Sequence, residues 1–261
     1  MPETRTYEVY AIKYAHHERR AGDNFIGGDP HDGPMPLDYF IWLVRSGERA
    51  LLVDTGFSAA TATRRSRDHL RCPTDGLRLL GVEAGAVRDV VVTHLHYDHV
   101  GNFDLFPAAT FHLQDDELSY ATGRHMCHPV FGGAYDVEDV VGMVRNVYRG
   151  RVRFHDGDAE LFPGVSVHRI GGHTKGLQVV RVATRRGWLV LASDASHFYA
   201  NMEQVRPFPI VYSVADMVEG YRRLRELAES AAHIIPGHDP EVLRRYPAPH
   251  RDLEGIVARL D

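Results

Sequence analysis

Hydrophobic residues along the chain either alternate with polar ones or form short apolar runs, and both patterns are typical of β-strands. Strands are predicted at residues 7–14, 39–45, 50–53, 90–93, 110–114, 152–154, 165–170, 178–183, 188–192 and 233–235. The strands at 39–45 and 50–53 are close enough to form a hairpin around Ser46, Gly47 and Glu48. Many short strands of this kind indicate at least one extensive β-sheet.

Helical periodicity appears between these strands. It predicts helices at 58–70, 137–148 and 214–230, and a further helix that begins with the acidic residues 115–117. Strands in two runs with helices between them predict an α/β fold, and we expect residues 1–261 to form one domain.

Three stretches do not fit the regular alternation. Residues 22–36 are rich in Gly, Asp and Pro and are long for a plain connection, which indicates a functional loop. Residues 196–211 are also irregular, and residues 122–149 look like an insertion. The apolar content of that insertion is compatible with a homodimer.

Composition narrows the class of protein. The net charge of −5 gives no electrostatic footprint for nucleic acid, and the basic run at 64–67 is interpreted as the solvated face of the helix at 58–70. No segment has the apolar length of a membrane span, and residues 1–5 lack the apolar core of a signal peptide, so a cytoplasmic protein is expected. Cys72 and Cys127 do not form a disulfide framework.

One short stretch carries most of the chemistry. His94, His96, Asp98 and His99 form an H-x-H-x-D-H pattern directly after the apolar run at 90–92. In an extended segment that turns into a loop, these side chains can face one cavity. Imidazole and carboxylate ligands suit a divalent transition metal, so the pattern predicts a metal site at the end of a strand.

Three further potential ligands, His173, Asp194 and His238, follow later apolar runs. A histidine-rich turn that binds nothing is the alternative, and a cluster with three such partners is hard to obtain by accident. His125 and His128 flank Cys127, but no further ligands lie nearby in the sequence, so we expect no metal there.

Together with the Val-Asp-Thr-Gly turn at 53–56, these motifs resemble those of the metallo-β-lactamase superfamily over residues 40–238. Within it, the chain is most similar to the N-acyl-homoserine lactonase branch. The resemblance implies a four-layer αββα sandwich and a centre with two divalent metal ions. Zinc is the expected metal, with manganese, iron and cobalt left open.

The resemblance also assigns ligands. It implies that His94, His96 and His173 hold one metal, that Asp98, His99 and His238 hold the other, and that Asp194 bridges them together with a hydroxide. Asp54, in the Val-Asp-Thr-Gly turn, either orients an imidazole or only caps its turn.

The implied activity is hydrolysis of a small-molecule lactone, by attack of the bridging hydroxide on the carbonyl carbon, with Asp98 or His197 moving the proton. His197 occupies the place where these lactonases usually carry a substrate-binding tyrosine, and Tyr199 is the alternative for that role. Lys175 replaces a common proline, and it either binds an anionic group of the substrate or lies on the surface. Apolar residues on loops or in the insertion either line the substrate pocket or pack in the core: Phe25, Ile26, Phe103, Phe106, Met126, Phe131, Phe198, Met202 and Phe208.

Other functions remain open. A thioesterase of the hydroxyacylglutathione hydrolase type requires a basic cluster near the C-terminus, for which Arg244 and Arg245 are weak support. A phosphodiesterase, another ester or amide hydrolase, and a metal-binding protein without catalysis are further alternatives. Classical β-lactamases of the superfamily lack an aspartate at the position of Asp194, and oxygen-reducing diiron members usually carry glutamate at that of His96.

Overall fold

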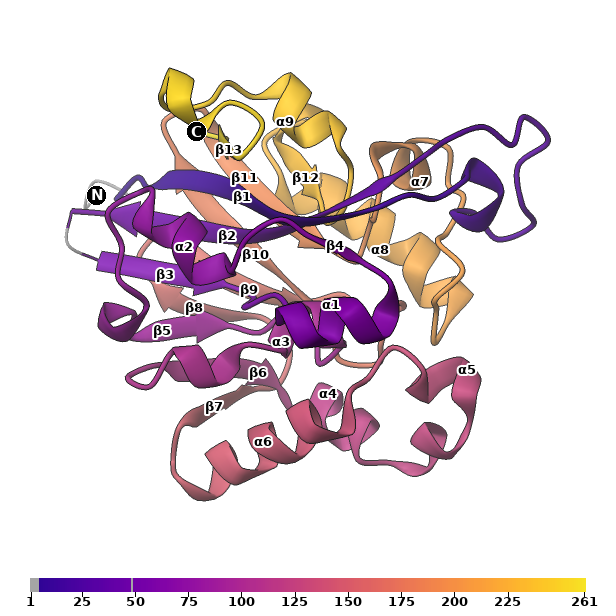
Figure 1. Ribbon diagram of the computed structural model, residues 1–261, viewed down its shortest axis with the longest axis horizontal. Helices are drawn as coiled ribbons and strands as arrows, with labels where there is room; N and C mark the ends of the chain where they lie inside the picture. Colours follow the sequence, from indigo (N-terminus) through magenta and orange to yellow (C-terminus); the bar gives the residue numbers. More distant parts are fainter. Residues whose placement is uncertain (1–4, 48) are drawn as a thin grey trace.

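The computed structural model describes residues 5–47 and 49–261. Two parts of the sequence discussed above lie outside these ranges. They are Glu48, in the predicted hairpin turn, and residues 1–4 of the N-terminal segment that was considered for a signal peptide. Within them the strands form two sheets (Figure 1).

The larger sheet has the order β13-β1-β2-β3-β5-β6-β7, with β4 also paired to β1. Its strands β1, β2 and β3 are antiparallel, whereas β3, β5, β6 and β7 run parallel. The bounds are β1 Glu8–His17, β2 Leu37–Ser46, β3 Arg49–Val53, β4 Asp68–His69, β5 Asp89–Val91, β6 Thr110–Gln114, β7 Val152–His155 and β13 Val257–Arg259.

The second sheet has the order β12-β11-β10-β9-β8. It is antiparallel except for β11 and β12, which are parallel. The bounds are β8 Ala159–Phe162, β9 Val165–Arg169, β10 Gln178–Thr184, β11 Gly187–Ser193 and β12 Ile234–Pro236.

The two-residue period of β2 explains how the larger sheet is buried on both faces. One set of alternating side chains enters a hydrophobic cluster shared with the second sheet, and the other set enters a cluster shared with helices. The first set is Phe40, Trp42 and Val44, and the second is Tyr39, Ile41 and Leu43. Because both sets of side chains are apolar, the sequence of β2 is a hydrophobic run from Tyr39 to Val44, as expected for a central strand.

Helices form the two outer layers. On the larger sheet, α1 (Ala59–Arg65), α2 (Pro73–Arg78) and α6 (Val137–Tyr148) contribute Ala62, Leu77 and Met143 to the second cluster. On the smaller sheet, α8 (Val214–Leu227) contributes Tyr221 and Leu224 to the first. The predicted four-layer αββα sandwich is therefore confirmed.

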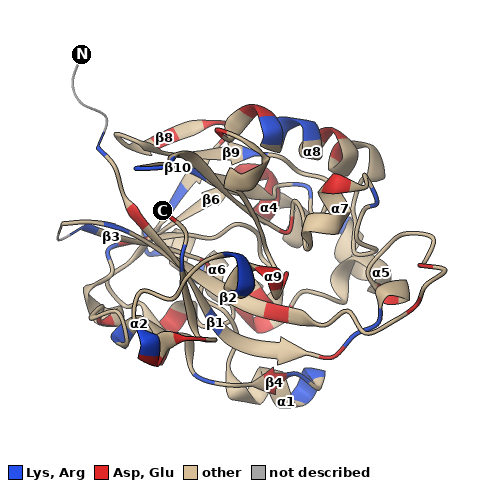
Figure 2. Ribbon diagram, turned by 90° about the horizontal axis from the view of Figure 1, so that it is seen from above, with Lys and Arg blue, Asp and Glu red and all other residues tan. Residues whose placement is uncertain are grey.

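The remaining helices are short and lie near the loops that follow the strands. They are α3 Tyr97–Val100, α4 Asp115–Ala121, α5 Pro129–Gly132, α7 Tyr199–Glu203 and α9 Glu241–Arg245. No helix in the described ranges is long and apolar enough to cross a membrane. Figure 2 shows acidic and basic residues interspersed over the ribbon, with both signs on α8.

The prediction for the helix at 58–70 was wrong at its end. α1 stops at Arg65 because Ser66 adopts a left-handed conformation, with φ of 55°. The chain then turns, and β4 pairs with β1. Arg67 therefore leaves the helix face on which the sequence pattern placed it.

Several elements gave no clear signal in the sequence. α2 begins at Pro73 and contains Gly76, both poor helix formers in a helix interior. The three-residue strand β13 completes the edge of the larger sheet beside β1, so tertiary pairing rather than local pattern specifies it. The irregular stretch at 196–211 contains α7, and the helix predicted at 214–230 ends at Leu227.

Residues 122–149, predicted to be an insertion, contain a 3₁₀ turn (Arg124–Cys127), α5 and α6. The bounds of α6 match the predicted helix, and Asp136 caps its N-terminus by accepting a hydrogen bond from the Glu138 amide. Val130, Val137 and Tyr148 are exposed here. The one-domain organisation, the insertion and the homodimer stay predictions.

Candidate metal centre

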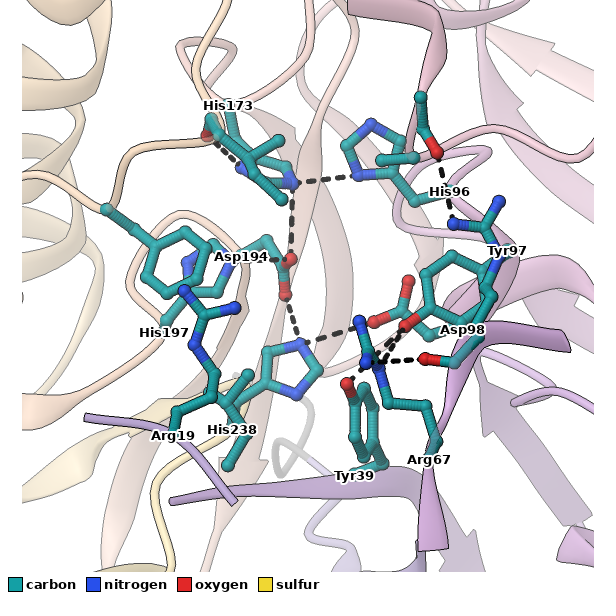
Figure 3. A pocket seen from close by; sticks show the side chains of 16 residues that line it. Arg19, Tyr39, Arg67, His96, Tyr97, Asp98, His173, Asp194, His197 and His238 are labelled. Carbon is teal, nitrogen blue, oxygen red and sulfur yellow. Dashed lines mark hydrogen bonds and ion pairs between the residues drawn. The ribbon is translucent and has the colours of Figure 1, made fainter. Parts of the chain in front are cut away.

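The candidate metal ligands gather at one rim of the sandwich because the strands that carry them end there. β5 leads into the segment with His94 and His96, and β9, β11 and β12 lead to His173, Asp194 and His238. The carboxyl ends of β5, in the larger sheet, and of β11 and β12, in the smaller, thus deliver ligands to one place from both sheets. Figure 3 shows His96, His173, Asp194 and His238 pointing toward one another.

Three imidazoles form the first group of donor atoms. His94 Nε2 and His173 Nε2 each lie 3.0 Å from His96 Nδ1. Asp194 Oδ2 lies 3.2 Å from His173 Nε2 and 3.8 Å from His94 Nε2. Ligand atoms at about 2.0–2.1 Å from a tetrahedral zinc ion are about 3.3 Å apart, so these separations suit one metal ion.

The second group contains Asp98, His99 and His238. Asp194 Oδ1 lies 3.3 Å from His99 Nε2 and 3.0 Å from His238 Nε2. Asp98 Oδ2 lies 3.7 Å from the first of these nitrogens and 3.8 Å from the second. The two oxygens of the Asp194 carboxylate therefore face different groups of donors.

Hydrogen bonds fix which ring nitrogens face the centre. His173 Nδ1 donates to the Ile210 carbonyl at 2.7 Å, and His238 Nδ1 donates to the Asp38 carbonyl at 3.0 Å. A carbonyl only accepts, so in the neutral rings Nε2 is left with a lone pair. These lone pairs face the Asp194 carboxylate, which also only accepts. A cation between them resolves this contact, and the donor set therefore fits divalent metal ions.

Asp54 supports this arrangement from the end of β3. Its Oδ2 lies 2.7 Å from His99 Nδ1, while its two oxygens accept hydrogen bonds from the Thr93 amide and hydroxyl, both at 2.8 Å. Thr93 Oγ1 also lies 2.9 Å from Ser193 Oγ on the other sheet. Asp54 and Ser193 have positive φ values of 61° and 45°, uncommon for residues other than glycine. Asp54 thus orients an imidazole and does more than cap its turn.

Gly237 allows the last ligand to approach. A Cβ atom at this position would lie 2.8 Å from Asp194 Oδ1 and 2.8 Å from the Ser193 carbonyl oxygen. Any larger residue would push the loop that carries His238 away from the Asp194 carboxylate.

Burial and the neighbouring carboxylates act in opposite directions on the charge of the centre. Burial disfavours the charged imidazoles, but Asp194 and other carboxylates outweigh it at His99 and His238 and raise the pKa of both rings. Burial lowers the pKa of His94 and His96 well below the usual range, so both rings are neutral and can act as ligands. Burial opposes ionisation of Asp194, but the imidazoles of His197, His238 and His99 hold the pKa of its carboxyl well below the usual range.

The structure brings His197 to the centre. His197 Nε2 lies 3.0 Å from Asp194 Oδ2, and the ring stacks on Phe208 at 3.7 Å between centroids. Burial lowers the pKa of His197 to about 3, against the effect of Asp194. Its Nδ1 has no hydrogen-bond partner among the described residues.

Tyr199 and Lys175 lie elsewhere. The Tyr199 ring packs in the cluster between the sheets, with the Arg245 guanidinium 3.6 Å from its centroid, and it does not line the cavity. Lys175 is partly exposed and pairs with Asp116 at 2.7 Å. Of the two alternatives for Lys175, the surface position is therefore the one observed.

Glu117 is a central residue that the sequence pattern did not single out. It is fully buried, and its oxygens accept hydrogen bonds from the Leu95 and Gly176 amides and from the Tyr135 and Thr174 hydroxyls, at 2.6–3.1 Å. It ties the loop that carries His94 and His96 to the loop that carries His173. In the sequence it is only one of three acids at the start of a helix.

A cavity of about 230 Å³ opens onto these residues. The sequence analysis anticipated some of its lining: His96, Asp98, His173, Asp194, His197, Phe208 and His238. Of the nine apolar residues considered for the pocket, the other eight do not line this cavity. The rest of the lining was not predicted to line a site: Tyr97, which lies within the His94–His99 motif, and Arg19, Leu37, Tyr39, Arg65, Arg67, Gly133, Ala134 and Ile210.

Comparison with known proteins agrees with this geometry. Residues 35–245 match the family model described as the metallo-beta-lactamase superfamily. N-acyl homoserine lactonase AttM of Rhizobium johnstonii is 32% identical over 172 residues, which are 64% of this chain and 63% of that relative, just under two thirds of its length.

Solved structures share the fold. A quorum-quenching N-acyl homoserine lactone lactonase superposes with a TM-score of 0.79 at 22% identity, covering 95% of this chain and 98% of the other. An N-acyl homoserine lactone hydrolase with N-hexanoyl-L-homoserine bound at its catalytic metal centre gives a TM-score of 0.77 at 21% identity, covering 94% and 98%.

Proposed function

The chain belongs to the metallo-β-lactamase superfamily, and we propose that it is a lactonase that uses two divalent metal ions to open the ring of a small lactone. The observation that carries this proposal is the Asp194 carboxylate, whose two oxygens face two separate groups of histidines. The similarity to N-acyl homoserine lactonase AttM supports the substrate class.

Each residue has a role in this proposal. His94, His96 and His173 would hold one ion, Asp98, His99 and His238 would hold the other, and the carboxylate of Asp194 would contribute to both. We propose zinc as the metal because imidazole and carboxylate ligands suit it. Bound at this site, the ions supply a hydroxide nucleophile at neutral pH and polarise the lactone carbonyl.

The surrounding residues orient the substrate and move protons. His197 lies against the bridging carboxylate and lines the cavity, where an imidazole can contact the carbonyl or the leaving oxygen of a lactone. Asp98 also lines the cavity and is the second candidate to carry the proton. Phe208 fixes the plane of the His197 ring by stacking on it.

The thioesterase alternative finds little support at this cavity. Arg244 pairs with Glu241 at 2.6 Å, and Arg245 stacks on Tyr199. Neither arginine lines the cavity.

We also propose that the protein acts in the cytoplasm as one domain with an insertion at 122–149, through which it can form a homodimer.

A substrate panel tests the function. Purified protein loaded with zinc is incubated with acyl-homoserine lactones, other small lactones and a glutathione thioester, and acid release is followed with a pH indicator. We expect lactone hydrolysis with about two equivalents of metal per chain, as the two-ion proposal requires. Efficient turnover of the thioester with no turnover of any lactone would overturn the proposal, and full activity with one equivalent of metal would overturn the two-ion centre.

A further inference from the structure

Three arginines line the cavity at the candidate metal centre: Arg19, Arg65 and Arg67. Arg19 follows β1, Arg65 ends α1, and Arg67 lies just beyond it. Figure 3 shows Arg19 and Arg67 among the side chains around His238 and Asp98. The cavity therefore combines a cation-binding centre with three further positive charges.

Arg19 has only neutral partners. Its Nε donates to Asn24 Oδ1 at 2.7 Å, and one terminal nitrogen donates to the Asp23 carbonyl. Its guanidinium lies 5.2 Å from the centre of the Phe208 ring. Across residues 5–47 and 49–261, no hydrogen bond engages its Nη1 and no carboxylate pairs with it.

Arg67 is held in the same way. Its Nε donates to the Tyr97 hydroxyl at 3.2 Å, and its Nη1 contacts the Arg65 carbonyl and His17 Nε2 at 2.6 and 3.1 Å. Burial, with the help of Arg67, lowers the pKa of His17 to about 4, so that ring brings no charge at neutral pH. Nη2 of Arg67 has no hydrogen-bond partner within the described part of the chain.

Arg65 completes the group. Its terminal nitrogens donate to the carbonyls of Gly133 and Tyr135 at 3.0 and 3.1 Å, and its guanidinium stacks on the Tyr97 ring at 3.9 Å. Tyr97 therefore positions two of the arginines, one on its face and one at its hydroxyl. Main-chain carbonyls and this ring hold Arg65 in place, and no carboxylate among the described residues forms a direct ion pair with it.

The charges in the cavity do not balance. The only acids in its lining, as far as the structure describes the chain, are Asp98 and Asp194, and both are assigned to the metal ions. Some arginines elsewhere pair with acids, as Arg206 does with Asp29 at 2.9 Å, whereas others, such as Arg151 and Arg181, donate to main-chain carbonyls outside this cavity. Partly buried guanidinium groups that make no direct ion pair favour binding of an anion, and their planar fork matches a carboxylate.

We propose that Arg19, Arg65 and Arg67 bind a carboxylate carried by the substrate, so that the preferred substrate is a compact lactone with an anionic substituent. This inference rests on the lactonase function proposed above. The cavity of about 230 Å³ is smaller than the usual 300–1,000 Å³ of drug-sized ligand sites, which favours a small ring over a long acyl chain.

A matched pair of substrates tests the inference on the metal-loaded protein. The first is 5-oxotetrahydrofuran-2-carboxylate and the second is its carboxamide, which has the same ring and leaving oxygen but no charge. Each kcat/KM is divided by the rate of hydroxide-catalysed opening of that lactone, which removes the difference in intrinsic reactivity. We expect the acid to be preferred by about ten- to a hundredfold, the effect of hydrogen bonds between charged groups. Raising the salt concentration should reduce this preference.

Arginine variants identify the groups responsible. Arg67→Gln and Arg19→Gln should each lower the acid-to-amide ratio by about tenfold, mainly through the KM of the acid. Arg64→Gln is the matched control because Arg64 neighbours Arg65 on α1, pairs with Asp136 instead and does not line the cavity. This control should keep the wild-type ratio.

The outcomes separate the two proposals. Equal use of acid and amide, with no salt effect, overturns the carboxylate site and leaves the lactonase function standing. No turnover of any lactone alongside hydrolysis of a thioester overturns the lactonase function itself. A wild-type ratio in both arginine variants overturns the assignment to these side chains. The wild-type ratio and its salt dependence decide the matter even where a variant does not fold.

Discussion

His197 stands where the resemblance to lactonases implies a substrate-binding tyrosine, and its contribution can be separated from metal binding. Its Nε2 lies 3.0 Å from the Asp194 carboxylate, and its ring lines the cavity. We expect His197→Ala to lower kcat by about ten- to ten-thousand-fold, the range for losing acid–base or oxyanion help. His197→Tyr should recover part of this loss if the role is hydrogen bonding alone. Steady-state kinetics with metal analysis of each variant measures both effects.

Tyr199→Phe is the control for this experiment. The tyrosine hydroxyl is buried without a hydrogen-bond partner among the described residues, and its ring lies in the core between the sheets. We expect its kcat to stay within about twofold of wild type, since no contact with reacting atoms is lost. Wild-type kinetics in His197→Ala would show that the histidine is only a loop residue.

Asp54 is predicted to act on metal affinity, not on turnover by the loaded enzyme. It holds His99 through Nδ1 and is itself held by Thr93. Asp54→Asn removes the negative charge behind this imidazole, so we expect zinc affinity to fall by about 10- to 100-fold. Competition with a chromophoric chelator gives the affinity. Asp89→Asn, which alters a His112 contact outside the site, is the control, and equal affinities in the two variants would contradict the role of Asp54.

At the residue scale, the sequence motif predicted those candidate metal ligands that lie close together in the chain. His94, His96, Asp98 and His99 are adjacent in the chain, and the structure brings them together with three distant partners. Arg67 could not be predicted in the same way, because its position depends on the left-handed conformation of Ser66. His197 and Tyr199 both lie in a segment without a regular sequence pattern. Their different positions follow from the start of α7, which places the His197 ring at the candidate centre and the Tyr199 ring in the core between the sheets.

At the level of elements, α4 connects two ligand loops through a single side chain. Glu117 accepts one hydrogen bond from the Leu95 amide, in the loop of His94, and one from the Tyr135 hydroxyl. It accepts two more from the loop of His173, donated by the Thr174 hydroxyl and the Gly176 amide. Glu117→Ala would leave buried donors without partners, so we predict a loss of about 3 kcal/mol in the free energy of unfolding. Glu117→Gln should also destabilise the protein, because its amide group would face donors. Urea unfolding of the metal-free variants measures the loss.

Asp116→Ala is the matched change on the same helix. Asp116 is partly exposed and pairs with Arg169 and Lys175 at the surface, and surface pairs of this kind contribute about 0–1 kcal/mol. The same small effect in both variants would contradict the organising role of Glu117. This role was invisible in the sequence because three consecutive acids at a helix start are normally explained by the helix dipole.

The predicted elements were most accurate where hydrophobic periodicity was strong. β6 and α6 have the predicted bounds, and β2 and β11 differ from prediction by one or two residues at each end. β8, β13, α2 and α9 were not predicted. In β13 the pairing with β1, a contact between the two ends of the chain, supplies the stabilisation that local pattern does not show.

At the scale of the whole molecule, the candidate centre joins the two sheets. His94 to His99 follow β5 of the larger sheet, whereas Asp194 and His238 follow β11 and β12 of the smaller one. Periodicity predicted the strands but not which of them face each other, so only the resemblance to a known family implied that these ligands meet. Without metal, lone pairs and carboxylates crowd this junction; with metal, the same groups link the sheets.

Metal removal is therefore predicted to destabilise the entire sandwich. Chelated protein should melt about 10 °C below the zinc-loaded protein, since a ligand at about 1,000 times its Kd adds about 4 kcal/mol to the stability of the native state. Differential scanning calorimetry during a zinc titration measures the shift. Magnesium should not restore it, because imidazole nitrogens are poor ligands for that ion.

Asp194→Ala should show a much smaller zinc-dependent rise, because the carboxylate shared by both groups of histidines is gone. A melting temperature unaffected by chelation in the wild type would mean that this junction holds no structural metal, and the two-ion proposal would then lose its basis.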